Sequence, residues 1–249
     1  MKTGAQLIVE CLLQHNVKYV FGIPGAKIDS VFNALLDSSI KVIVCRHEQN
    51  AAFMAAAYGR ITGKPGVVIV TSGPGVCNLA TGLLTATTEG DPVIAIGGNV
   101  SRNMLLRGSH QSTDNMTLML AVTKARMSAE MPELIPEIIE NAFRIALNPR
   151  RGAVFINLPQ DVSIATSKAV ARKPDTEYCS VVARQNIFVK AAQLINNAKL
   201  PILLLGMDAS IQENATAIRK LLLQHPFPCI STYQASGVIS QDEYKFLLD

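Results

Sequence analysis

The sequence predicts an α/β protein built on a doubly wound, mostly parallel sheet. Segments typical of strands and of helices alternate between residues 3 and 159, as they do in parallel α/β folds. Two of the strand-like segments, residues 66–71 and 92–98, are continuous apolar runs, which is typical of strands covered by helices on both faces. Glycine-containing turns follow both runs, at the carboxyl ends of strands, where ligands bind in such sheets.

The helix and strand signals can be placed in chain order. Thr3 is a candidate N-cap for the first helix and Gly63 a candidate end for the third. Helices are expected at residues 3–15, 27–38, 48–62, 76–88 and 132–148. Strands, which are short and rich in β-branched residues, are expected at residues 18–22, 41–45, 66–71, 92–98, 121–128 and 152–159. A long polar loop is expected between residues 99 and 115.

A second α/β unit is expected after a linker at residues 166–185, a polar segment that contains Pro174. Helical spacing resumes at residues 186–198 and 211–224, and apolar strand-like runs follow each of these segments. About two and a half strand–helix units are too few to close a sheet of ordinary size. We therefore expect the chain to be part of a longer protein.

Composition excludes several classes of function. The net charge of +4 is spread along the chain without a basic run, and tryptophan is absent, so nucleic-acid binding has no support. No apolar stretch has the roughly 18 residues of a membrane span. The cysteines form no C-x-x-C pair, which predicts reduced thiols in a cytoplasmic protein and no metal site. They are Cys11, Cys45, Cys77, Cys179 and Cys229.

Glu48 and the turn at residues 73–75 are the first candidates for chemistry. Glu48 stands at a predicted helix start, where an acid is also favoured by the helix dipole alone, and this structural role is the better reading of the spacing. The Gly-Pro-Gly turn can expose a helix N-terminus to a ligand, or simply join a strand to a helix. The chain has no G-x-G-x-x-G and no P-loop motif.

Lys27, His110 and Gln111 are candidates for substrate binding. Lys27 is expected in the first turn of a helix, where a cation opposes the helix dipole, so holding a substrate carboxylate is one role and a solvated surface lysine is the other. His110 and Gln111 lie in the long loop. Loops of this length in compact domains are often functional, although a polar surface loop needs no function.

In combination, these residues resemble the thiamine-diphosphate-dependent enzymes of the acetolactate synthase and pyruvate oxidase superfamily. The segments that carry the resemblance are FGIPG at 21–25, HEQNAA at 47–52, TSGPG at 71–75 with Asn78, and NLPQDV at 157–162. The likeness extends over residues 1–249. GIPGAKID at 22–29 and HQSTD at 110–114 are most similar to the catabolic, FAD-independent acetolactate synthases.

The resemblance implies a domain order and a set of cofactors. Residues 1–165 would bind the pyrimidine end of thiamine diphosphate, and residues 186–249 would begin the central α/β domain. The family holds the diphosphate and Mg²⁺ through a Gly-Asp-Gly motif in a third domain. This chain contains no such motif, so the metal ligands would lie outside it, and FAD is not expected.

The resemblance also implies roles for individual residues. Glu48 would be catalytic, because the family's matching carboxylate hydrogen-bonds N1′ of the aminopyrimidine and promotes loss of the thiazolium C2 proton. Lys27, His110 and Gln111 would lie near the substrate. The cofactor-binding residues would be Gly25, Glu48, Thr71, Gly73, Pro74, Gly75 and Asn78.

The implied reaction joins two pyruvates to give 2-acetolactate and carbon dioxide, in a homodimer or tetramer with the cofactor at the subunit interface. A sister enzyme, such as pyruvate oxidase or another 2-oxo acid decarboxylase, is the nearest alternative. A non-catalytic subunit of the same fold is another, although the presence of Glu48 argues against it. By itself the 249-residue chain is expected to be inactive.

Overall fold

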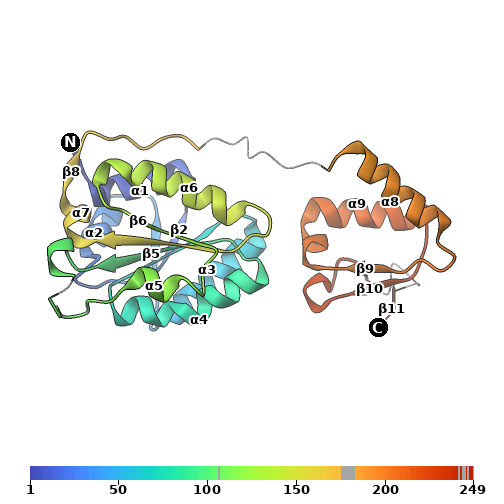
Figure 1. The fold of residues 1–249 in the computed structure, drawn as a ribbon, viewed down its shortest axis with the longest axis horizontal. Coiled ribbons are helices and arrows are strands. Elements are labelled where there is room, and N and C mark those ends of the chain that lie inside the picture. Colours follow the sequence, from blue (N-terminus) through green and yellow to red (C-terminus); the bar gives the residue numbers. More distant parts are fainter. Residues whose placement is uncertain (106, 175–182, 241, 243–244, 246, 249) are drawn as a thin grey trace. The chain divides into compact units, whose positions relative to one another are not determined.

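A computed structural model describes residues 1–105, 107–174, 183–240, 242, 245 and 247–248 (Figure 1). The chain forms two compact units, Met1–Tyr178 and Cys179–Asp249. Cys179, one of the five cysteines, lies outside the described residues. The other cysteines are free thiols.

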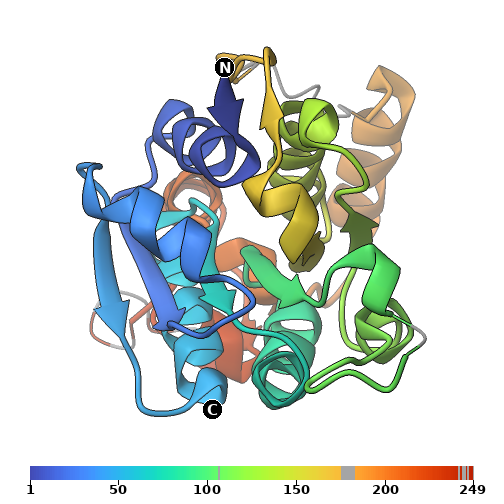
Figure 2. The same cartoon turned by 90° about the vertical axis from the view of Figure 1, so that its left-hand side faces the viewer.

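The first unit is built on a six-stranded parallel sheet with the strand order β3-β2-β4-β5-β7-β6. Its helices cover both faces of the sheet (Figures 1 and 2). This arrangement confirms the predicted doubly wound fold. The strands are β2 (Tyr19–Ile23), β3 (Lys41–Val44), β4 (Gly66–Val70), β5 (Val93–Asn99), β6 (Ala125–Ser128) and β7 (Ala153–Pro159).

Each face of the sheet has its own helices and core. One core contains residues of α1 (Gly4–Gln14), α2 (Asp29–Leu36) and α6 (Ile135–Leu147). The other contains residues of α3 (Glu48–Thr62), α4 (Pro74–Glu89) and α5 (Asn115–Met119). Successive strand residues alternate between them: Val67 and Ile69 belong to the first core, Val68 and Val70 to the second. This alternation explains why the strand sequences are apolar throughout.

Local sequence signals determine several helix ends. Thr3 forms a capping box with Gln6, whose backbone N–H donates to the Thr3 hydroxyl at 3.2 Å while the Gln6 side chain accepts from Thr3 N at 2.9 Å. Gly63 ends α3 in the left-handed conformation, with φ of 70°. These two predictions are confirmed.

Four features differ from the expectations. Lys27 precedes α2, which begins at Asp29, so it lies in a turn and not in the first helical turn. The long loop contains a 3₁₀ turn (Arg102–Met104) and leads into α5, which Asp114 caps by accepting from Thr117 N at 3.0 Å. The strand expected at 121–128 covers only Ala125–Ser128. After β7 come α7 (Gln160–Ile164) and β8 (Thr166–Ser167).

The short strand β8 pairs antiparallel with β1 (Lys2–Thr3). The sequence predicts a linker at residues 166–167 because they are polar. Their pairing partner, β1, lies at the other end of the unit in sequence. A two-residue strand carries no periodicity of its own, so its sequence could not reveal the pairing.

The second unit contains a three-stranded parallel sheet in the order β11-β10-β9, formed by β9 (Leu203–Leu205), β10 (Cys229–Ser231) and β11 (Leu247–Leu248). Its helices are α8 (Gln185–Asn197) and α9 (Gln212–Gln224), and 3₁₀ turns at Met207–Ser210 and Tyr233–Ala235 follow β9 and β10. In neither unit is a described helix both long and apolar enough to cross a membrane.

His15 is a buried titratable group between α1 and α6. Its ring stacks on Phe143 at a centroid distance of 3.9 Å, and its Nε2 lies 3.1 Å from Oε2 of Glu140. Burial lowers the pKa of His15 to about 4, so the folded protein holds the imidazole neutral over a range in which an unfolded chain protonates it.

We predict that His15 makes stability depend on pH between about 6.5 and 4. Because the unfolded state binds the additional proton in this window, the stability present above pH 6.5 is lost as the pH falls toward 4. His15→Leu should reduce the loss of unfolding free energy between pH 7 and pH 4.5 by on the order of 1–2 kcal/mol. Urea unfolding followed by circular dichroism measures this, with His110→Asn as the exposed-histidine control. An unchanged pH dependence in His15→Leu would contradict it.

Candidate active site

The carboxyl ends of β2 and β4 form a point where the chain diverges. These strands are neighbours in the sheet, yet β2 leads to α2 on one face and β4 leads to α4 on the other. Divergence of this kind opens a crevice at the edge of an α/β sheet. Glu48 follows β3, the other neighbour of β2, and so lies at the same edge.

Glu48 is the first residue of α3 and is partly buried. His47 caps the helix in an extended conformation, and its Nδ1 accepts from the Gln49 backbone N–H at 3.1 Å. The Glu48 Oε2 accepts a hydrogen bond of 2.8 Å from Nδ2 of Asn78, in α4. This bond holds the carboxylate between the N-terminal turns of α3 and α4.

The glycine turn brings the backbone close to this carboxylate. Gly73 adopts φ of 58°, which favours glycine. A Cβ on Gly75 would lie 3.0 Å from Thr71 Cγ2 and 3.5 Å from Glu48 Oε1, and one on Gly25 would lie 2.7 Å from Thr71 Cβ. Side chains at either glycine would therefore crowd the space around Thr71.

The structure thus brings most of the predicted cofactor residues together. Thr71 contacts both glycines, and Gly75 adjoins the Glu48 carboxylate that Asn78 holds. Pro74 is exposed at the first position of α4, where proline is favoured because its missing N–H would be unpaired in any case.

Two of the predicted substrate residues lie against the same turn. The Lys27 backbone N–H donates to Thr71 Oγ1 at 3.4 Å. Gln111 adopts φ of 62°, and its backbone oxygen lies 2.9 Å from the position of a Cβ on Gly73. His110, the third candidate, is exposed beside Gln111.

A buried cluster of amides supports the loop that carries Gln111. Asn157 Oδ1 accepts from Nδ2 of Asn99 at 3.1 Å and of Asn115 at 2.9 Å, and Asn157 Nδ2 donates to Ser128 Oγ at 3.0 Å. Asn99 and Asn115 stand on either side of the loop. Sequence reasoning missed this cluster, although asparagines at the ends of apolar strands were a visible signal.

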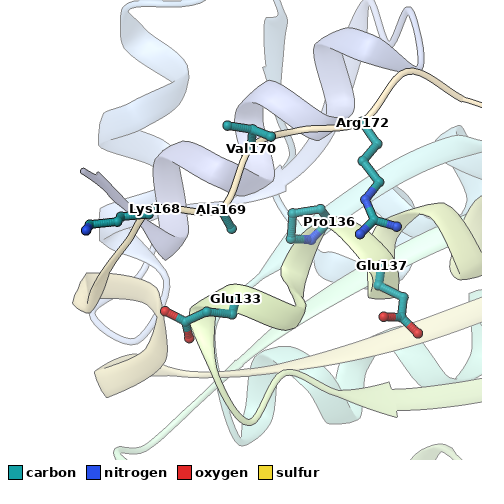
Figure 3. A pocket seen from close by; sticks show the side chains of 7 residues that line it. All are labelled: Glu133, Pro136, Glu137, Lys168, Ala169, Val170 and Arg172. Atoms are coloured by element: carbon teal, nitrogen blue, oxygen red, sulfur yellow. The ribbon is translucent and has the colours of Figure 1, made fainter.

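The described residues contain no group of three or more His, Cys, Asp or Glu side chains that could hold a metal ion. A cavity of about 230 Å³ lies elsewhere, between the start of α6 and the segment after β8 (Figure 3). None of the candidate residues lines it. Its lining residues are Glu133, Pro136, Glu137, Lys168, Ala169, Val170 and Arg172.

Comparison with known proteins relates the first unit to a family of enzymes. Residues 2–118 match the model of "Thiamine pyrophosphate enzyme, N-terminal TPP binding domain". The chain is 51% identical over 240 residues to an acetolactate synthase of Bacillus subtilis, an alignment that covers 96% of this chain and 42% of the relative.

Other relatives give a consistent result. The chain is 44% identical over 245 residues to the catabolic acetolactate synthase of Raoultella terrigena, covering 97% of this chain and 43% of the relative. It is 33% identical over 242 residues to the 2-hydroxyacyl-CoA lyase 1 of Mus musculus, an alignment that covers 95% of this chain and 41% of the relative. The chain therefore spans less than half the length of these relatives.

We predict that Asn78→Asp destabilises the first unit in a pH-dependent way. The substitution places a second carboxyl group where the amide now lies, 2.8 Å from Glu48 Oε2, and two carboxylates at that distance repel each other. We expect a loss of about 1–3 kcal/mol in unfolding free energy at pH 7, and a smaller loss at pH 4, because acid weakens the repulsion between carboxylates. Asn50→Asp, at an exposed position near the start of α3, is the control in urea unfolding. Equal effects at the two positions would contradict the prediction.

Proposed function

We propose that the protein carrying this chain condenses two pyruvates to 2-acetolactate with loss of carbon dioxide, because residues 2–118 match the N-terminal TPP binding domain of thiamine pyrophosphate enzymes. The observation that carries the proposal is the Glu48 carboxylate, held by Asn78 beside the Gly75 backbone. The similarity to acetolactate synthases over almost the whole chain supports this choice of reaction.

The residues around Glu48 fit the pyrimidine end of thiamine diphosphate. A carboxylate beside a turn that contains two glycines can accept a hydrogen bond from a ring nitrogen of a flat heterocycle. In this proposal Gly25, Thr71, Gly73, Pro74 and Gly75 line the ring, and Asn78 orients Glu48. When bound, the cofactor supplies the carbon nucleophile that adds to a 2-oxo acid and accepts the electron pair released by decarboxylation.

In this proposal Glu48 acts by favouring a proton on a ring nitrogen of the cofactor. Asn78 occupies Oε2, and Oε1 has no hydrogen-bond donor among the described residues. Oε1 faces Gly75, where the absent side chain leaves room for a ligand. A hydrogen bond from a cationic ring nitrogen to Oε1 is charge-assisted, so Glu48 favours the protonated ring.

Lys27, Gln111 and His110 are proposed to bind the substrate. The Lys27 ammonium would pair with the carboxylate of pyruvate, while Gln111 and His110 would border the space for the second pyruvate. Support comes from the packing of Lys27 against Thr71 and of Gln111 against Gly73. The resemblance at residues 110–114 to FAD-independent enzymes supports a reaction without FAD.

Other parts of the protein are proposed to hold the diphosphate and Mg²⁺. The described residues lack a cluster of metal ligands, and the relatives are more than twice as long as the matched region. We propose that the cofactor lies at the interface of a homodimer or tetramer. In support, α3 and α4 expose large apolar side chains along their length, including Met54 at 42%, Ile61 at 83% and Leu84 at 45%.

The free thiols among the described cysteines favour a reducing compartment, and we propose the cytoplasm. A sister activity is the alternative: a pyruvate oxidase, another 2-oxo acid decarboxylase, or a lyase such as the mouse relative. Product analysis separates these reactions. Incubation of the intact protein with pyruvate, thiamine diphosphate and Mg²⁺ should yield one acetolactate and one carbon dioxide per two pyruvates, without added FAD.

We predict that Glu48→Gln in the intact protein lowers acetolactate turnover by ~100- to 10,000-fold while leaving the fold intact, since removal of a proton-transfer partner commonly costs this much. The measurement is the rate of acetolactate formation at saturating cofactor, with circular dichroism to check folding. Glu133→Gln, an exposed position in the cavity of Figure 3, is the control and should retain turnover. Near-normal turnover in Glu48→Gln would reject the role of Glu48.

A further inference from the structure

Gln160 connects two distant parts of the chain at the candidate site. It is the first residue of α7, directly after β7. Its Oε1 accepts from Lys27 Nζ at 3.4 Å, and its Nε2 donates to the Ala26 carbonyl at 3.0 Å. Both polar atoms of the Gln160 side-chain amide therefore bond to the turn before α2.

Hydrogen bonds link the start of α7 to α2 and to the loop after β5. Ser163 Oγ donates to the Gln160 carbonyl at 2.7 Å, and Ser30 Oγ in α2 donates to Ser163 Oγ at 2.8 Å. Asp161 accepts from the backbone N–H of Arg102 at 3.1 Å and from its Nε at 2.8 Å. Burial alone would raise the pKa of Asp161, but the hydrogen bonds and charge of Arg102 outweigh burial and hold it below its usual value.

Lys27 is a flexible cation held by a neutral partner. Among the described residues, no carboxylate lies within the ion-pairing distance of 4.0 Å from its Nζ. A lysine side chain loses considerable rotamer freedom when it is fixed, and the Gln160 amide restricts that freedom before a ligand arrives. Because glutamine carries no charge, the positive charge of Lys27 is left available.

We propose that Gln160 is a positioning residue that aims the Lys27 ammonium at the carboxylate of a 2-oxo acid. The inference rests on the proposed function, because it assumes that Lys27 binds the substrate carboxylate. A pre-oriented cation costs less to order on binding. Since every 2-oxo acid has this carboxylate, Gln160 should affect affinity for the class and not selection among its members.

The discriminating pair of variants is Gln160→Glu and Gln160→Leu in the intact protein. Gln160→Glu preserves the shape but puts a carboxylate next to Lys27, so it should compete with pyruvate for the ammonium. We expect KM for pyruvate to rise by about 10-fold or more in Gln160→Glu, further than in Gln160→Leu, with kcat changed less than KM. Thermal stability should be no lower in Gln160→Glu than in Gln160→Leu, because the new carboxylate pairs with Lys27.

Three further variants separate positioning of Lys27 from structural support. Ser163→Ala breaks the link between α7 and α2 without touching Lys27, so it should lower the melting temperature and leave KM within about twofold. In a Lys27→Met background, Gln160→Glu and Gln160→Leu should have equal KM values. A purely structural role would instead make KM follow melting temperature across all these variants.

Each outcome decides the inference. Equal KM values for Gln160→Glu and Gln160→Leu with Lys27 present, or a wild-type KM in Gln160→Leu, would overturn it, even if the wild-type protein makes acetolactate. If the wild-type protein consumes another 2-oxo acid instead, the proposed function fails, and the same variants measured with that acid still test Gln160. If the wild-type protein consumes no 2-oxo acid, both proposals fail.

Discussion

The candidate site depends on one constraint: after β2 and β4 the chain continues to opposite faces of the sheet. Two neighbouring parallel strands end at one edge, and their helices must cover different faces because each face needs its own apolar layer. The edge between them cannot be filled by either helix. Glu48, Thr71 and the glycines therefore meet at a position that the topology opens, and the glycines keep side chains from closing it.

The position of Glu48 also depends on the far end of α3. Arg60 forms a bidentate ion pair with Asp91, with two N–O distances of 2.8 Å, and Asp91 is only 4% exposed. Small residues bring α3 close to its neighbours: a Cβ on Gly82 would lie 2.5 Å from Ala52 Cβ. Because α3 is held at its last turn and along one side, its first residue has little freedom to move. The carboxylate of Glu48 is thus placed by packing along the whole of α3.

The sequence predicted the features that follow from local patterns, and missed those that depend on distant partners. The buried strands and the Gly63 helix end were correct because apolar runs and a left-handed glycine are visible within a few residues. The start of α2 was misplaced, because a turn after a strand and a helical first turn share the same residue types. The contact between Lys27 and Gln160 joins residues 133 positions apart. Such pairings depend on the order of strands in the sheet, which no short segment encodes.

The charged groups of the candidate site share one property: each is oriented by a neutral amide. Asn78 donates to the Glu48 carboxylate, and Gln160 accepts from the Lys27 ammonium. An ion pair would fix each side chain as firmly but would cancel the field that a ligand meets. An amide supplies a dipole that selects one rotamer and leaves the net charge in place. If Glu48 and Lys27 act on opposite charges, on a cationic ring and on a substrate carboxylate, then amide partners are the chemical choice that keeps both charges available in one crevice.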